Sequence, residues 1–171
     1  ILCHQDVQLI GEGRTELDRR LDELERRDPA WAVAGNAGGV APGRLALRIT
    51  DPHGKDQKAG PFPIRVTSLD ENFIVVKRAA RIGFSHDLGG FHFYGADICL
   101  AADLMGYSAY VIDFHLEHLS PGNSRSTAFA EGLEQFQRKW CHALRPRWVQ
   151  TTCALAAISG NAAGRLWRRA A

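Results

Sequence analysis

Residues 90–118 read GFHFYGADICLAADLMGYSAYVIDFHLEH, and this stretch decides the fold that the sequence predicts. It opens with a glycine-bracketed aromatic turn. Residues 96–105 are good helix formers, and Gly106 stands where a C-cap glycine belongs. Residues 107–114 are rich in aromatic and β-branched side chains and predict a strand. A turn, a helix and a strand in succession indicate an α/β fold.

Three polar residues of this stretch stand where α/β proteins place ligand chemistry. Asp97 falls at the start of the helix, and His115 and His118 fall where the strand ends. Carboxylates are favoured at helix N-termini, and open α/β sheets bind ligands beyond the carboxyl ends of their strands. The alternative interpretation is a capping aspartate and two surface histidines.

The first seven residues predict a strand that ends in polar side chains. Residues 1–3 are apolar, and residues 4–7 read HQDV. Asp6 is then a carboxylate at the sheet edge, and hard oxygen ligands of this kind suit a divalent cation. A strand followed by an ordinary polar turn is the alternative interpretation.

A glycine-rich segment follows a second apolar stretch. Residues 31–34 predict a short buried strand, and residues 35–39 read GNAGG. Glycines allow a ligand to approach the backbone closely, although no P-loop lysine or GxGxxG pattern follows. The candidate substrate contacts, here and in the aromatic turn, are Gly35, Gly38, Gly39, Phe91 and Tyr94.

The remaining segments are assigned by their periodicity. Leu17, Leu21 and Leu24 form the apolar stripe of a helix that ends near residue 28. Strands are expected at residues 44–50, 64–66 and 73–76, a hairpin connection or mobile loop at 51–63, and a second amphipathic helix at 126–144.

Bulk properties exclude several classes of function. A length of 171 residues suits one domain, and a net charge of +2 without a basic stripe predicts no nucleic-acid partner. The four cysteines lack zinc spacing and are expected to be buried thiols of a reducing compartment, so we expect a cytoplasmic protein. The sequence has no apolar run that could span a membrane, and we expect no signal peptide. The tail is interpreted either as a helix covering the core or as an amphipathic segment in peripheral contact with a membrane.

Four sequence blocks together resemble one enzyme group. In chain order they are HQDV (4–7), WAVAGNAGG (31–39), TSLDENFIVV (67–76) and the stretch at 90–118, and an FxxKW pattern follows at 136–140. The set resembles GT-A glycosyltransferases of the family 2 type that carry HQDV in place of the usual DxD motif. The resemblance implies a GT-A-like (Rossmann-like) mixed sheet flanked by helices. It makes residues 1–144 a partial catalytic domain without its N-terminal nucleotide-binding βαβ part, and residues 145–171 a helical tail.

The resemblance also implies a metal site. Asp6 matches the last acid of the DxD-like motif, which binds the divalent cation, Mg²⁺ or Mn²⁺, on the nucleotide diphosphate. His118 matches the histidine that closes this site, and His115 is the second candidate. His4 matches the degenerate first position of the motif, so we do not count it among the expected ligands.

The catalytic base is expected in the acidic motif that opens the helix. Asp97 lies in that motif, but Tyr94 and Gly95 occupy the positions where the usual motif has Glu-Asp. Asp87 and His92 are therefore kept as further candidates.

The expected function is inverting transfer of a sugar from a nucleotide-sugar donor to a glycan or another hydroxyl acceptor. In such a reaction a cation neutralises the leaving diphosphate, and a carboxylate takes the proton of the acceptor hydroxyl. The alternative is a catalytically inactive module of the same fold that binds a carbohydrate or a nucleotide.

Overall fold

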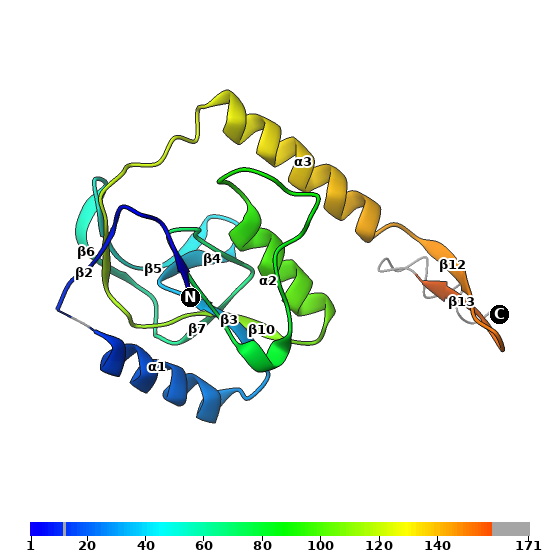
Figure 1. Cartoon of the computed structure of the whole chain (residues 1–171), viewed down its shortest axis with the longest axis horizontal. Coiled ribbons are helices and arrows are strands. Elements are labelled where there is room, and N and C mark those ends of the chain that lie inside the picture. The colour runs from blue at the N-terminus through cyan, green and yellow to red at the C-terminus, as the bar shows by residue number, and fades with distance from the viewer. Residues whose placement is uncertain (12, 159–171) are drawn as a thin grey trace. The chain divides into compact units, whose positions relative to one another are not determined.

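The computed structural model describes residues 1–11 and 13–158 and has a mixed α/β architecture (Figure 1). The chain divides into two compact units, Ile1–Gly132 and Leu133–Ala171. The division falls within helix α3 (Thr127–Ala143), before the boundary at residue 144 that the sequence suggested.

The first unit contains a five-stranded mixed sheet. Strand β9 runs antiparallel to both of its neighbours, whereas β10 and β3 are parallel. In spatial order the strands are β1 (Leu2–Cys3), β9 (Phe73–Val76), β3 (Trp31–Gly35), β10 (Ser108–Val111) and β7 (Ile64–Val66). The predicted mixed sheet of an α/β protein is therefore confirmed.

Each face of this sheet is covered by one helix. Ile74 and Val111 belong to a core that includes residues of α2 (Tyr94–Leu104). Their strand neighbours Phe73 and Tyr110 belong to a second core, which includes residues of α1 (Arg14–Arg27). Successive strand residues point to opposite faces, so α1 and α2 lie on opposite sides of β3 and β10 (Figure 1).

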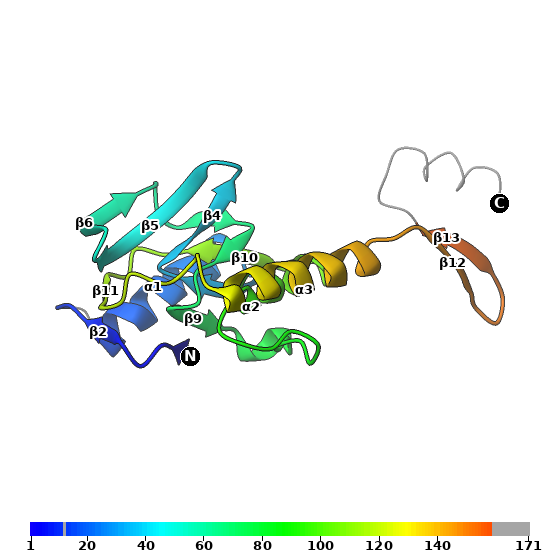
Figure 2. The same ribbon diagram turned by 90° about the horizontal axis from the view of Figure 1, so that it is seen from above.

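A second sheet continues from the end of β3. Figure 2 shows its strands β4, β5 and β6 side by side. In spatial order its strands are β2 (Val7–Leu9), β11 (Leu116–His118), β5 (Arg44–Asp51), β4 (Ala37–Ala41) and β8 (Ser68–Leu69), with β6 (Gly54–Ala59) paired to β5. Residues 51–63 were expected to be a hairpin connection or mobile loop, but they contain strand β6, which forms a hairpin with β5, while β7 lies in the other sheet.

The glycines of β3 and β4 make room for β8. A Cβ at Gly38 would overlap the carbonyl oxygen of Ser68, and one at Gly35 would lie 2.9 Å from Leu69 Cδ2. A Cβ at Gly39 would lie 2.7 Å from Ser68 Oγ. The segment that the sequence suggested to be a loop is thus largely strand, and a contact of these glycines with substrate stays a prediction.

Helices α1 and α2 follow the sequence pattern closely. In α1, Leu17 and Leu24 are buried, as the apolar stripe predicted. Helix α2 begins at Tyr94, slightly before the expected start, and Gly106 follows it with a φ of 84°. Because this φ suits glycine, the predicted C-cap is confirmed. A short 3₁₀ helix, Arg78–Ala80, follows β9.

The second unit contains the rest of α3 and a β-hairpin. Strands β12 (Arg147–Gln150) and β13 (Leu155–Ile158) are antiparallel, and the Thr151 hydroxyl accepts the N–H of Ala154 at 2.9 Å in their turn. The sequence predicted a helical tail at residues 145–171, and this prediction is wrong for β12 and β13. Trp148 and Val149 favour a strand, and the hydrogen bonds of the Thr151 hydroxyl favour a turn, so both outweigh the helix propensity of the neighbouring residues. Residues 159–171 lie outside the described part.

The cysteines only partly match expectation. All four are free, but only Cys99 is buried, whereas Cys3, Cys141 and Cys153 are exposed. Within residues 1–11 and 13–158, no helix has the length and apolar character needed to cross a bilayer.

We expect Gly38→Ala to lower the free energy of unfolding by about 2–3 kcal/mol, because the added methyl group would push β4 and β8 apart. Urea denaturation measures this change. Gly13→Ala is the matched control, since among the described residues no side chain or strand that Gly13 packs against lies within 4 Å of its would-be Cβ, and the loss there should stay below about 1 kcal/mol. Equal stability of the two variants would contradict the packing role of Gly38.

Candidate metal centre

Strand pairing brings the two ends of the first unit's sequence together. Strand β11 runs antiparallel to β2, and His118 is the register partner of Val7. The backbone N–H of Leu119 donates to the carbonyl of Asp6 at 3.0 Å, which extends this pairing into the β1–β2 turn. His118 is thereby placed beside Asp6, as the sequence predicted.

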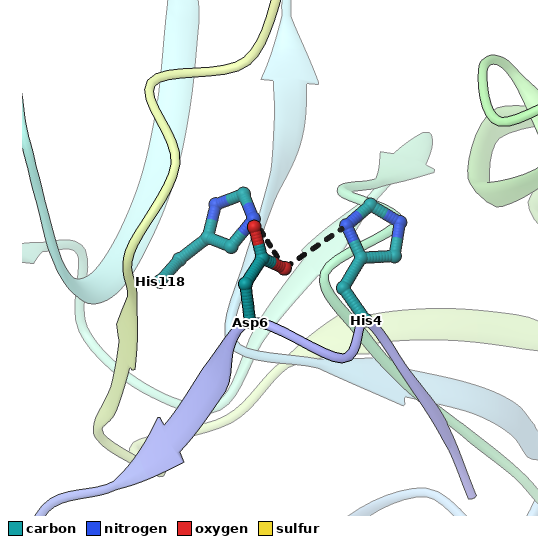
Figure 3. A group of neighbouring side chains, drawn as sticks. All are labelled: His4, Asp6 and His118. Carbon is teal, nitrogen blue, oxygen red and sulfur yellow. Dashed lines mark ion pairs between the residues drawn. The ribbon is translucent and has the colours of Figure 1, made fainter.

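Three side chains converge at this point. Asp6 Oδ1 lies 3.4 Å from His118 Nε2 and 4.0 Å from His4 Nδ1. The ligand atoms of the three residues all lie within 4.8 Å of one another. Figure 3 shows the Asp6 carboxylate between the two imidazoles, with His4 and Asp6 on one short segment and His118 on another.

The Asp6 carboxylate is suited to remain ionised. Partial burial raises its pKa, but the hydrogen bond with Ser120 and the nearby imidazoles of His118 and His4 outweigh burial and lower it below 3.8. Its Oδ1 is shielded from solvent and accepts no hydrogen bond within the described residues. A shielded oxygen of this kind is costly unless a cation or another partner satisfies it.

The donor set fits a divalent transition metal. Ligand atoms on opposite sides of a cation are about 4.2 Å apart when each bond is about 2.1 Å long, so small side-chain rotations would close this group around an ion. Two imidazoles and one carboxylate favour Mn²⁺ over Mg²⁺, because Mg²⁺ prefers oxygen ligands alone. His4, which was not counted among the expected ligands, is thus part of the group.

His115 lies in a different environment. Its Nε2 is 2.9 Å from the Thr50 hydroxyl, and its Nδ1 is 3.7 Å from Asp56 Oδ1. It does not belong to the group formed by His4, Asp6 and His118. The structure therefore gives His115 a link to strand β5, and a metal-ligand role is not supported by its position.

The start of α2 is tied to the same region. The Tyr94 hydroxyl lies 3.2 Å from His4 Nε2 and donates to the backbone carbonyl of Glu71 at 3.1 Å. The Glu71 carboxylate accepts the N–H of Gly95 at 3.0 Å. Burial, with smaller contributions from the carboxylates of Glu71 and Asp70, raises the pKa of Tyr94 to about 12, so its hydroxyl keeps its proton.

Glu71 places a second carboxylate, besides Asp97, at the start of α2. At Gly95, one of the two positions where the sequence resemblance led us to expect Glu-Asp, a Cβ would overlap the carbonyl oxygen of Leu69. Burial raises the pKa of Glu71 to about 7, although the hydrogen bond from Gly95 opposes this rise. Because Glu71 is partly exposed and its pKa is near 7, it can exchange a proton near neutral pH.

The predicted catalytic residues are spread around this helix start. Asp97 lies in the first turn of α2 but is buried, with 1% of its surface exposed. Asp87 is exposed in the preceding loop, and His92 packs against Phe129 with ring centres 5.2 Å apart. Phe91, a predicted substrate contact, is 76% exposed.

Sequence reasoning missed Glu71 and undervalued His4. Glu71 stands in the block at residues 67–76, where it was taken as part of an acidic turn, and its partner Gly95 is far away in sequence. For His4, the signal was its place two residues before Asp6, which puts both side chains in the same turn.

A scan of known protein families gives no match to this chain. The chain is 45% identical over 126 residues to the protein named ATP synthase subunits region ORF 6 of Fuscovulum blasticum. The match covers 69% of the chain and 50% of that protein, so the chain spans about half the length of the curated relative it matches. That name states no activity, and the function is therefore argued from the site.

We expect the free energy of unfolding to fall by on the order of 1–3 kcal/mol between pH 4.5 and 7 because of Glu71. The folded protein holds the Glu71 proton up to about pH 7, whereas the unfolded chain releases it near 4.5, so stability is lost as the pH rises. Glu71→Gln keeps an oxygen for the Gly95 N–H and should remove this slope in urea denaturation at several pH values.

Glu16→Gln is the matched control. A hydrogen bond from Arg19 lowers the pKa of Glu16 to about 2, so this change should leave the slope between pH 5 and 7 intact. An unchanged slope in Glu71→Gln would show that another group titrates there.

Proposed function

We propose that this chain is part of a divalent-metal-dependent glycosyltransferase that moves a sugar from a nucleotide-sugar donor to a hydroxyl acceptor, with inversion. The observation that supports it best is the convergence of His4, Asp6 and His118. These residues come from two of the blocks that resemble HQDV-type GT-A enzymes. The mixed sheet with helices on both faces agrees with the fold that this resemblance implies.

The proposed roles follow from charge. Asp6, His4 and His118 would hold the cation, which when bound neutralises the charge that develops on the leaving nucleoside diphosphate. The lowered pKa of Asp6 keeps this ligand anionic over the whole physiological pH range. Of Mg²⁺ and Mn²⁺, the two cations that the resemblance implies, we propose Mn²⁺, because two of the three ligands are imidazoles and Mg²⁺ prefers oxygen ligands.

The base is proposed among the carboxylates at the start of α2. Asp97 was the sequence-based candidate, but an acceptor has to reach the base, and Asp97 is 1% exposed. Glu71 is partly exposed, and its pKa of about 7 suits a group that takes up a proton near neutral pH. We therefore place Glu71 before Asp97, and both before Asp87, which lies exposed in the loop preceding α2.

An inactive binding module is the second candidate. The burial of Asp97 and the absence of room for an acid at Gly95 favour it, because both weaken the usual catalytic motif. Such a module would bind the nucleotide or sugar through the same cation without turnover. The donor set also occurs in iron(II) oxygenases, and the ordered sequence blocks favour the transferase over that class.

We expect the chain to bind Mn²⁺ more tightly than Mg²⁺. We expect His118→Ala to weaken Mn²⁺ binding by more than about 100-fold, because loss of a metal ligand costs more affinity than loss of a hydrogen bond to a ligand. Calorimetric titration with each metal measures this. His115→Ala is the matched control and should bind Mn²⁺ normally once circular dichroism shows that it is folded. A loss in His115→Ala and none in His118→Ala would move the ligand role to His115.

We expect Glu71→Gln to slow release of nucleoside diphosphate from a nucleotide sugar by about 10²–10⁴-fold, because the amide cannot take up the acceptor proton. Its Mn²⁺ affinity should stay near that of the unchanged chain. Asp97→Asn, assayed in parallel, should have a smaller effect. A larger loss of turnover in Asp97→Asn than in Glu71→Gln would return the base role to Asp97. If the unchanged chain binds the donor and Mn²⁺ but shows no turnover, the inactive module is favoured.

A further inference from the structure

The Tyr94 hydroxyl has two neighbours and only one proton. It lies 3.1 Å from the carbonyl oxygen of Glu71 and 3.2 Å from His4 Nε2. A carbonyl oxygen can only accept, so the phenol proton points toward Glu71. The hydroxyl oxygen then faces His4 as an acceptor.

This arrangement decides which nitrogen of His4 carries the proton. Neutral imidazole has one N–H, on either Nδ1 or Nε2, and an acceptor opposite Nε2 favours the proton there. The lone pair is then on Nδ1, the nitrogen that lies 4.0 Å from Asp6 Oδ1. A metal binds imidazole through such a lone pair, and a hydrogen bond at the other nitrogen fixes the ring.

Contacts of its backbone and its ring hold the Tyr94 side chain in place. Tyr94 is the first residue of α2, and the next residue is held by the bond from its N–H to the Glu71 carboxylate. The Tyr94 ring also packs edge-on against Phe84, with centres 5.4 Å apart. The hydroxyl that faces His4 therefore belongs to a side chain that stands at the start of a helix and is packed against Phe84.

We propose that Tyr94 is a positioning residue that holds His4 in its Nε2-protonated tautomer and so leaves Nδ1 ready to bind a divalent cation. The inference rests on the metal centre of the proposed function. It gives Tyr94 a different role from the substrate contact that the sequence suggested.

The test begins with metal-free protein. Nuclear magnetic resonance of isotope-labelled histidine at about pH 8, with the His4 signal assigned by a His4→Asn variant, reports the tautomer directly. The unchanged chain should show Nε2–H at His4. Tyr94→Phe removes only the hydroxyl and should shift His4 toward a mixture of tautomers.

Calorimetric titration with Mn²⁺ alone gives the second readout. Tyr94→Phe should bind Mn²⁺ roughly 10- to 100-fold more weakly, as expected when a hydrogen bond to a metal ligand is lost. Tyr110→Phe is the matched control, because it removes a hydroxyl that bonds to Asp28 at 2.9 Å and has no contact with His4 among the described interactions. It should leave both the tautomer and the Mn²⁺ affinity unchanged.

The outcomes separate the two proposals. An Nδ1–H tautomer in the unchanged chain, or an unaltered tautomer and Mn²⁺ affinity in Tyr94→Phe, overturns the role of Tyr94. If the unchanged chain binds no Mn²⁺, the proposed function fails, and the tautomer ratio in metal-free protein still decides the inference about Tyr94.

Discussion

The pairing of β2 with β11 is the constraint on which the candidate metal centre depends. Two strands of three residues each, far apart in sequence, fix His118 opposite Val7 and therefore beside Asp6. A slip of one residue would turn the His118 side chain to the other face of the sheet. Strand β11 also pairs in parallel with β5, which holds it in register from its second edge. The site is thus a product of long-range pairing, although its residues were visible in the sequence.

The sequence predicted what depends on local pattern. The stripe of Leu17 and Leu24 gave helix α1, and Gly106 marked the end of α2. It did not predict that Gly38 lies in a strand, because the reason is contact with β8, which no local pattern reveals. The link from Glu71 to Gly95 was missed for the same physical reason. Asp6 and His118 were identified as a pair only because the sequence motifs that contain them resemble motifs of a known enzyme group in the same order along the chain.

Two carboxylates of this region are shifted in opposite directions. The pKa of Asp6 is lowered by its hydrogen bond and its imidazole neighbours despite partial burial, whereas burial raises the pKa of Glu71 to about 7. One group is therefore permanently anionic near neutral pH, and the other changes protonation there. Separate environments for two acids are a common way to divide charge stabilisation from proton transfer. Tyr94 connects the two environments through His4 and the Glu71 backbone.

The shortness of β1 has a consequence for motion at this edge. Strand β1 has two residues, and its ladder with β9 consists of two residue pairs. Edges held by so few backbone hydrogen bonds open locally at low free-energy cost, which amide hydrogen exchange detects. His4 follows directly after this strand, and Asp6 lies in the turn between β1 and β2. A cation that joins them to His118 would add its binding free energy to the cost of that opening, so occupancy of the site and rigidity of the edge would rise together.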